Sequence, residues 1–286
     1  MSKAKYISLN GKLLLSSEAC LMHDNRGLLY GDSFNIQCRG TSSKVFFFDQ
    51  YFEYIIKQFA EMQMIKPKLL KKDFFQTDIE LLLQKNRIYQ GFKLNIVFFR
   101  NTTDSDFHAT DNTVSVLISA EKLPEEYFKH NEKGLFIDTY EKIKFPVTIC
   151  NWFNSPVFSP EMLIKHNIKS KKYDNYILLN TENFPFKAID NELIFIKDNT
   201  LIFSGQTQNN YYKIITGIIK DIAENKNFQI SEKNIKTSEI VNMDEIMLIN
   251  PVMGIQWVVG FKEKRYTGKI SKLFVDELNK SAIKTI

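Results

Sequence analysis

The chain has 286 residues, and its 38 Lys and Arg against 33 Asp and Glu leave a formal net charge of +5 with histidine neutral. Hydrophobic residues make up 44% of the chain, with only 11 Gly and 7 Pro. This composition is typical of a globular protein and excludes disordered, collagen-like and mucin-like chains. The length allows one large domain or two ordinary ones.

The cysteines and the N-terminus indicate a reducing compartment. Three widely spaced cysteines form neither a disulfide framework nor a zinc cluster, and the four histidines have no partner at metal-ligand spacing. The N-terminus lacks a signal-peptide pattern, and no window reaches the roughly 18 apolar residues of a membrane span. We therefore expect a soluble, cytoplasmic protein with no membrane or metal site.

Basic residues are spread along the chain, and their densest cluster lies between Lys165 and Lys172. We interpret this cluster as a solvated helix end rather than a phosphate-binding patch, and we expect no nucleic-acid partner.

The first part of the chain predicts an α/β domain over residues 1–120. Asn10-Gly11 between two apolar runs is the strongest short hairpin signal. Asp49 is the expected N-cap of a helix with apolar positions Phe52, Ile55, Ile56, Phe59 and Met62. A second helix is predicted over 71–85 with Phe75, Ile79, Leu82 and Leu83 on one face, and strands over 5–9, 12–15, 92–99 and 113–119.

Residues 121–134 mix acidic and basic side chains with a Pro and a Gly after a strand, which predicts an interdomain linker. A second domain is then expected over residues 135–286. Ser159 and Pro160 form an N-cap and first-turn pair for one of its helices. Further helices are predicted over 211–223 and 270–282, and strands over 135–139, 175–179, 192–196, 201–203, 245–249 and 255–259.

No motif of known chemistry emerges from the residues alone. The chain has no glycine-rich phosphate loop, no Gly-x-Ser-x-Gly turn and no Cys/His signature. The residues alone therefore predict a two-domain α/β protein and no particular activity.

Two segments resemble a known family. Residues 24–32 read DNRGLLYGD and resemble the D-x-R-G-x-x-Y-G-D signature of class IV (fold type IV) pyridoxal-phosphate enzymes, which include branched-chain aminotransferases, D-amino-acid transaminases and aminodeoxychorismate lyases. Residues 244–258, DEIMLINPVMGIQWV, are similar to the late strand-turn-strand block of that family. The resemblance implies an α+β fold with an N-terminal α/β domain, a C-terminal pseudobarrel with flanking helices, a cofactor cleft between them and a homodimer.

The same resemblance implies a lysine that forms a Schiff base with pyridoxal phosphate. Counting back without gaps from the strand at residues 175–180 places that lysine position at Asn154, and asparagine cannot form an imine. The alternative is Lys169, because Ile168-Lys169-Ser170 matches the I-K-S/T sequence that surrounds the lysine in the family. If Lys169 were the family lysine, the helix that the family has between this lysine and the next strand would be missing. The residues from Ser159 to Lys169 predict a helix at that place.

The other family positions also depart from the pattern. The phosphate arginine falls on Tyr54, and the carboxylate that protonates the pyridine ring falls on Lys187. The phosphate turn G-I/V-T/M-R falls on residues 213–216, so Lys213, Ile215 and Thr216 replace its glycine, third residue and arginine.

Our first hypothesis is that the protein has lost pyridoxal phosphate and transamination and acts as a binding or scaffolding homodimer, with a small acidic ligand or a biosynthetic enzyme as partner. The alternative is an active aminotransferase or aminodeoxychorismate-type lyase that uses pyridoxal phosphate on Lys169. A third is cofactor-free chemistry in the same cleft. The side chains expected at that cleft are Arg26, Tyr30, Asn154, Lys187 and Lys213. Arg26 and Tyr30 are interpreted as organising the domain and the dimer, and Lys187 and Lys213 as making the cleft cationic.

Overall fold

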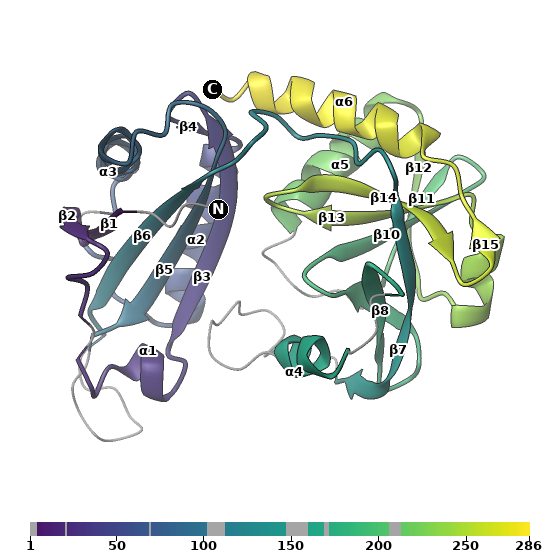
Figure 1. Ribbon diagram of the computed structural model, residues 1–286, viewed down its shortest axis with the longest axis horizontal. Helices are drawn as coiled ribbons and strands as arrows, with labels where there is room; N and C mark the ends of the chain where they lie inside the picture. The colour runs from purple at the N-terminus through teal and green to yellow at the C-terminus, as the bar shows by residue number, and fades with distance from the viewer. Residues whose placement is uncertain are drawn as a thin grey trace. The chain divides into compact units, whose positions relative to one another are not determined.

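The computed structural model of the protein describes residues 5–20, 22–68, 70–101, 112–146, 160–168, 172–205 and 213–286. These residues divide into two compact units. Unit 1 comprises the described residues up to Tyr127 together with Ala282–Ile286, and unit 2 comprises those from Phe128 to Ser281. Each unit has its own sheet (Figure 1).

The sheet of unit 1 has six strands in the order β2-β1-β6-β5-β3-β4, and every pairing is antiparallel. Asn10 and Gly11 have φ of 54° and 78°, as a two-residue hairpin turn requires, so the predicted hairpin is confirmed. The strands are β1 (Tyr6–Leu9), β2 (Lys12–Leu15), β3 (Ser33–Thr41), β4 (Lys44–Val45), β5 (Phe92–Arg100) and β6 (Val114–Lys122).

Strand β3 was not predicted, although Phe34, Ile36 and Cys38 alternate with polar residues along it. It pairs with β5 over eight residues, and its one aromatic side chain, Phe34, is buried in the core of unit 1. Phe34 stacks on Phe98 at a centroid distance of 4.7 Å and meets Phe59 edge-on at 5.6 Å. These rings join the sheet of unit 1 to helix α2.

The helices of unit 1 are α1 (Arg26–Leu29), α2 (Phe48–Glu61) and α3 (Lys72–Lys85). Helix α3 buries the four side chains predicted for it. For α2 the predicted N-cap was wrong and the predicted apolar face was confirmed only in part. The N-cap is Phe47, with φ of 56°, one residue before the helix, instead of Asp49. The predicted face is confirmed at Ile55 and Phe59, which are buried, whereas Phe52, Ile56 and Met62 are only half-buried. The other residues that α2 buries are Phe48, Tyr51, Tyr54 and Gln58.

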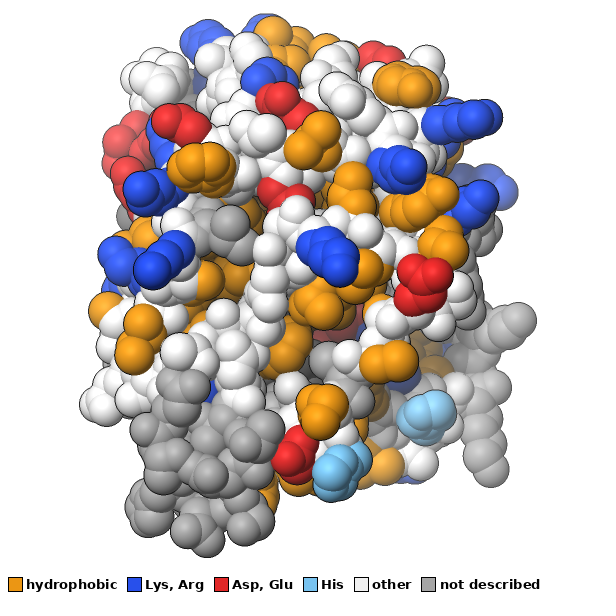
Figure 2. All heavy atoms as spheres, turned by 90° about the vertical axis from the view of Figure 1, so that its left-hand side faces the viewer, with side chains coloured by type: hydrophobic (Ala, Val, Ile, Leu, Met, Phe, Trp, Pro, Cys, Tyr) orange, Lys and Arg blue, Asp and Glu red, His pale blue; other side chains and the backbone are white. Residues whose placement is uncertain are grey.

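Figure 2 views the molecule from the side on which β2 and α3 lie in Figure 1, and its apolar side chains are dispersed among charges of both signs. The exposed Phe74 and Leu81 of α3 line a cavity of about 160 Å³ together with the hairpin residues Asn10 and Gly11. Among the coloured side chains of this view, no basic stripe of the kind that binds nucleic acid stands out.

The sheet of unit 2 has nine strands and curls into a half-barrel (Figure 1). Its order is β12-β11-β10-β13-β14-β7-β8-β9, with β15 paired to β14. Strands β9, β12 and β15 were not predicted. The strands are β7 (Leu135–Phe145), β8 (Asn175–Asn180), β9 (Pro185–Ala188), β10 (Glu192–Lys197), β11 (Thr200–Phe203), β12 (Gln229–Glu232), β13 (Glu245–Asn250), β14 (Gly254–Phe261) and β15 (Lys264–Arg265).

Helices α4 (Pro160–Asn167), α5 (Lys213–Asn225) and α6 (Lys269–Ile283), with the 3-10 turn η2 (Thr237–Asn242), flank this sheet. The carboxylate of Glu245, 2% exposed, accepts hydrogen bonds from the backbone N–H groups of Ile270 and Ser271 at 2.9 and 3.0 Å. A carboxylate at the N-terminus of a helix accepts hydrogen bonds from the free backbone N–H groups of the first turn and interacts favourably with the helix dipole. This contact anchors α6 on the sheet of unit 2.

The division between the units falls between Tyr127 and Phe128, inside residues 121–134. Glu121 and Lys122 complete β6, and Phe128 is buried, with its backbone N–H and C=O both bonded to the Asn279 side chain. Among the described residues no helix is long and apolar enough to cross a membrane.

Candidate functional site

The segment over residues 24–32 folds as α1 and a tight turn. Asn25 caps the helix by accepting a hydrogen bond from the backbone N–H of Leu28 at 3.1 Å. Gly31 has φ of 69°, in the left-handed region that glycine adopts without steric cost. The turn brings Asp32 back onto Arg26, with 3.0 Å between Oδ2 and Nε.

Asp32 neutralises a second buried cation. Arg100 of β5 donates from Nε to the same Oδ2 at 2.9 Å and from Nη2 to the carbonyl of Met62 at 2.9 Å. Arg26 and Arg100 are only 4% and 7% exposed. One carboxylate therefore holds two buried guanidinium groups and ties α1, β5 and the end of α2 together.

Tyr30 lies at the surface of this arrangement. Its ring centre is 5.1 Å from the guanidinium carbon of Arg26, and the side chain is 42% exposed. A guanidinium over an aromatic face is attracted to the ring quadrupole. The structure thus brings the predicted Arg26 and Tyr30 into contact.

Tyr54, which the sequence resemblance predicts to stand at the family's phosphate-arginine position, lies in the core of unit 1. It is 7% exposed, and burial raises the pKa of its hydroxyl, so it stays neutral. It cannot replace the positive charge of an arginine. Asn154 and Lys169 both lie outside the described residues.

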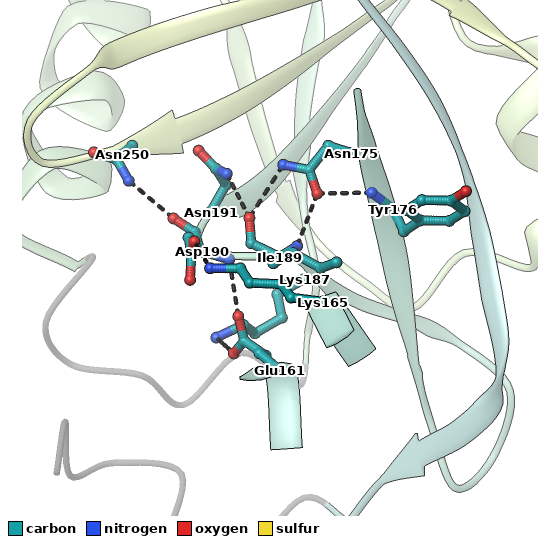
Figure 3. A network of polar contacts seen from close by, with 9 residues as sticks. All are labelled: Glu161, Lys165, Asn175, Tyr176, Lys187, Ile189, Asp190, Asn191 and Asn250. Atoms are coloured by element: carbon teal, nitrogen blue, oxygen red, sulfur yellow. Dashed lines mark hydrogen bonds and ion pairs between the residues drawn. The ribbon is translucent and has the colours of Figure 1, made fainter. Parts of the chain in front are cut away.

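In unit 2 the polar contacts of Figure 3 centre on the turn between β9 and β10. Lys187 of β9 pairs with Glu161 of α4, with 2.5 Å between Nζ and Oε1, and the two residues are 8% and 9% exposed. The other oxygen of Glu161 accepts a hydrogen bond from the backbone N–H of Asp190 at 2.8 Å. Lys165 of α4 pairs with the Asp190 side chain. Two ion pairs and one hydrogen bond therefore hold α4 against the turn between β9 and β10.

Asparagine side chains hold the same turn from two other elements (Figure 3). Asn175 of β8 donates to the carbonyl of Ile189 and accepts from its N–H, both at 3.1 Å. Asn250, at the end of β13, donates to the carbonyl of Asp190 at 2.9 Å. Asp190 itself has φ of 57°. The position of the turn is thus set from α4, β8 and β13.

The first strand residue after this turn is Glu192, a site residue that the sequence reasoning missed. It is 5% exposed, and burial raises the pKa of its carboxyl to about 7, although the positive charges of Lys187 and Lys213 act in the opposite direction. Glu161 adds a smaller upward effect on that pKa. The two lysines predicted to face one site therefore both act on Glu192.

Glu192 lines a cavity of about 270 Å³ inside unit 2. The remaining wall comes from one face of α5 and from the ends of β11 and β12; it consists of Phe203, Ser204, Gly205, Lys213, Thr216, Gly217, Lys220 and Glu232. Thr216 is 8% exposed, and the predicted Ile215, 1% exposed, is buried beside it. No local sequence signal marks this cavity, because its wall joins four separate segments.

The fit of these residues to pyridoxal phosphate can be judged at two positions. The group needs a carboxylate against its ring nitrogen and a cation at its phosphate. At the first position Lys187 is a buried cation that already neutralises Glu161. At the second Tyr54 is a neutral core residue. If these two positions correspond to the family's as the resemblance predicts, neither residue supplies the group that the cofactor needs.

The fold matches solved structures along nearly its whole length. The branched-chain aminotransferase of the archaeon Thermoproteus uzoniensis, solved with norvaline, superimposes with a TM-score of 0.83, at 14% identity, over 98% of this chain and 95% of that one. A putative 4-amino-4-deoxychorismate lyase of Legionella pneumophila gives 0.81 at 13% identity, covering 93% and 97%. The predicted fold type IV architecture, with an N-terminal α/β unit and a C-terminal pseudobarrel with flanking helices, is confirmed.

The family follows from the sequence match. The model of the family "Amino-transferase class IV" matches residues 38–260. A probable branched-chain-amino-acid aminotransferase of Rickettsia bellii (strain RML369-C) is 21% identical over 235 residues, which cover 82% of this chain and 80% of that protein. The chain belongs to the class IV aminotransferase family.

Replacing Asp32 by Asn should destabilise the protein by about 3 kcal/mol, because two buried guanidinium groups lose their counter-charge. Urea unfolding followed by circular dichroism measures this change. The matched control is Asp49→Asn, which removes an exposed partner of Lys72 and should cost less than about 1 kcal/mol. Equal costs for the two variants would show that Asp32 does not hold the segment.

The pKa of Glu192 predicts a pH-dependent stability. Because the folded-state pKa, about 7, lies above the ordinary value of 4.5, the folded protein retains a proton that the unfolded chain releases. Stability should therefore fall as pH rises from about 4.5 to 7, by up to ~3 kcal/mol. Glu192→Gln should remove this loss, so that the variant and the parent are similar at pH 4 and differ at pH 8. Urea unfolding of both proteins at pH 4 and pH 8 measures this difference. If the stabilities of the parent and the variant change with pH by the same amount, Glu192 does not have the raised pKa.

Proposed function

We propose that this member of the class IV aminotransferase family no longer binds pyridoxal phosphate and acts as a binding protein for a small acidic ligand. The observation that carries the proposal is the buried ion pair of Lys187 with Glu161. The resemblance predicts that Lys187 stands where the family has the carboxylate that keeps the pyridine nitrogen protonated. A buried ammonium next to the ring nitrogen opposes its protonation, so the ring could not act as an electron sink.

The charges around Glu192 support an acidic ligand. Lys187 and Lys213 both act on this carboxyl, and Lys213 and Lys220 line the same cavity. Lys213 is exposed and Lys220 is half-buried at the cavity wall, and a cleft lined by cationic side chains attracts anions. A binding or scaffolding role beside a biosynthetic enzyme is consistent with this loss of cofactor chemistry.

The second candidate is an active pyridoxal-phosphate enzyme that uses Lys169. It is favoured by the match to the family model over residues 38–260 and by the aminotransferase named among the relatives. Fold similarity alone does not decide between the two, because one fold supports several functions.

The test is cofactor retention. The purified protein is incubated with excess pyridoxal phosphate, desalted, reduced with borohydride and mapped by mass spectrometry, with an active class IV aminotransferase as a positive control. We expect no visible absorption band and no modified lysine in this protein, because Lys187 disfavours the bound ring. A retained band with a modification on Lys169 would overturn the proposal and establish the second candidate.

We also propose a homodimer. Within residues 24–32, the neighbouring side chains of Leu28 and Leu29 are 60% and 54% exposed, and Met22 just before them is 64% exposed. Exposed apolar patches mark contact surfaces. Sedimentation analysis should therefore give twice the chain mass of 33.5 kDa. The matched variants are Leu28→Glu, which should shift the protein towards the monomer, and Leu81→Glu on α3, which should not. A monomer for the unmodified protein at all concentrations would exclude the dimer.

A further inference from the structure

The cavity between α5 and the sheet of unit 2 has the features of a built binding site. Residues 213, 216, 217 and 220 recur at helical spacing, so they form one face of α5 that lines the cavity opposite Glu192. A volume of about 270 Å³ corresponds to about nine waters of liquid volume. The space thus suits a ligand of fewer than about ten non-hydrogen atoms.

Glu192 supplies the independent observation that points to a ligand. Its Oε1 is buried and has no hydrogen-bond partner within the part of the chain that the structure describes. A buried carboxyl oxygen without a partner costs about 1–3 kcal/mol. A ligand that hydrogen-bonds to this carboxyl would remove that cost.

The surrounding charges decide which ligand is suitable. Lys187 is paired with Glu161, and Lys220 is paired with Glu232. Lys213 forms no ion pair with any described residue, although it acts on both Glu192 and Glu232. One ammonium and one buried carboxyl therefore remain for a ligand, and the ammonium requires an anion.

We propose that this cavity binds a small monocarboxylate, which forms an ion pair with Lys213 and accepts a hydrogen bond from the protonated carboxyl of Glu192. This inference rests on the proposed acidic ligand and names its chemical class and its site. An O–H donor to a carboxylate is among the stronger hydrogen bonds of proteins. An ionised Glu192 would instead repel the anion, so binding takes up a proton.

Charged groups from several elements surround Glu192. Lys187 of β9, Lys213 of α5 and Glu161 of α4 act on the pKa of its carboxyl. Lys220 of α5 and Glu232 of β12 line the same cavity and are paired with each other. The residue of β13 paired with Glu192 is Ile249, which carries no charge. The described lysines outnumber the other carboxylates here, yet burial still keeps the pKa of Glu192 near 7.

The experiment is a titration of the ¹⁵N-labelled full chain with sodium propionate at pH 6 and pH 8, followed through the amide signals of Gly205 and Gly217. Because the protonated fraction of a group with pKa near 7 falls about tenfold between these values, affinity should fall about tenfold. Glu192→Gln keeps an N–H donor and should bind equally at both pH values. Lys213→Met should lose binding at both.

Two further variants locate the ligand. A Cβ added at Gly217 meets no atom within 4 Å among the described residues, so Gly217→Leu should fold and block the cavity. Lys226→Gln removes a lysine that lies just beyond α5 and pairs with Glu277, and it should bind as the parent does. Unfolding curves of all four variants confirm that loss of binding is not loss of fold.

The proposal is overturned if propionate shifts no amide in the cavity, if Gly217→Leu or Lys213→Met binds normally, or if the parent and Glu192→Gln have the same pH dependence. Inorganic phosphate that binds as well as propionate at both pH values would also overturn it, because it would indicate a general anion site. The titration uses no pyridoxal phosphate, so its failure is separate from that of the cofactor test.

Discussion

The buried ammonium of Lys187 is the constraint on which the candidate site depends. A cation removed from water must be neutralised, and the carboxylate that does so comes from Glu161 on another element. The second oxygen of Glu161 then fixes the backbone of Asp190, while Asn175 and Asn250 fix the same turn from other sides. Glu192 begins β10, the strand that follows this turn. Its position therefore depends on the ion pair of Lys187 with Glu161. The site is therefore preorganised by structural contacts and not by a ligand.

Unit 1 satisfies the same constraint differently. Asp32 compensates two buried guanidinium groups at once, so its charge is fully used within the fold. In unit 2 the carboxyl of Glu192 is buried without an equivalent partner among the described residues, and it lies at the wall of a cavity. That contrast is the reason for assigning binding to unit 2 and organisation of the fold to the signature segment.

The sequence predicted features that depend on local rules. The Asn10-Gly11 hairpin follows from turn stereochemistry, and the apolar face of α3 follows from helical spacing. Features that depend on distant contacts were missed. The pairing of Lys187 with Glu161 spans 26 positions, as the residue numbers give, and has no local pattern. Glu192 was placed correctly at the start of a strand, but its burial arises only when α5 and β11 close over it. The N-cap of α2 was misplaced because Phe47 adopts a left-handed backbone that aromatic residues rarely take.

The glycine in the middle of α5 carries a consequence for anyone engineering this chain. Alanine in place of a helical glycine usually stabilises a protein by about 0.5–1 kcal/mol, and at Gly217 nothing in the described residues obstructs the added methyl group. A design procedure that optimises folding alone would therefore choose this substitution early. If the same procedure then chose larger apolar side chains at this position, they would fill the cavity that Glu192 lines. The resulting protein would be more stable but would have no space for a ligand.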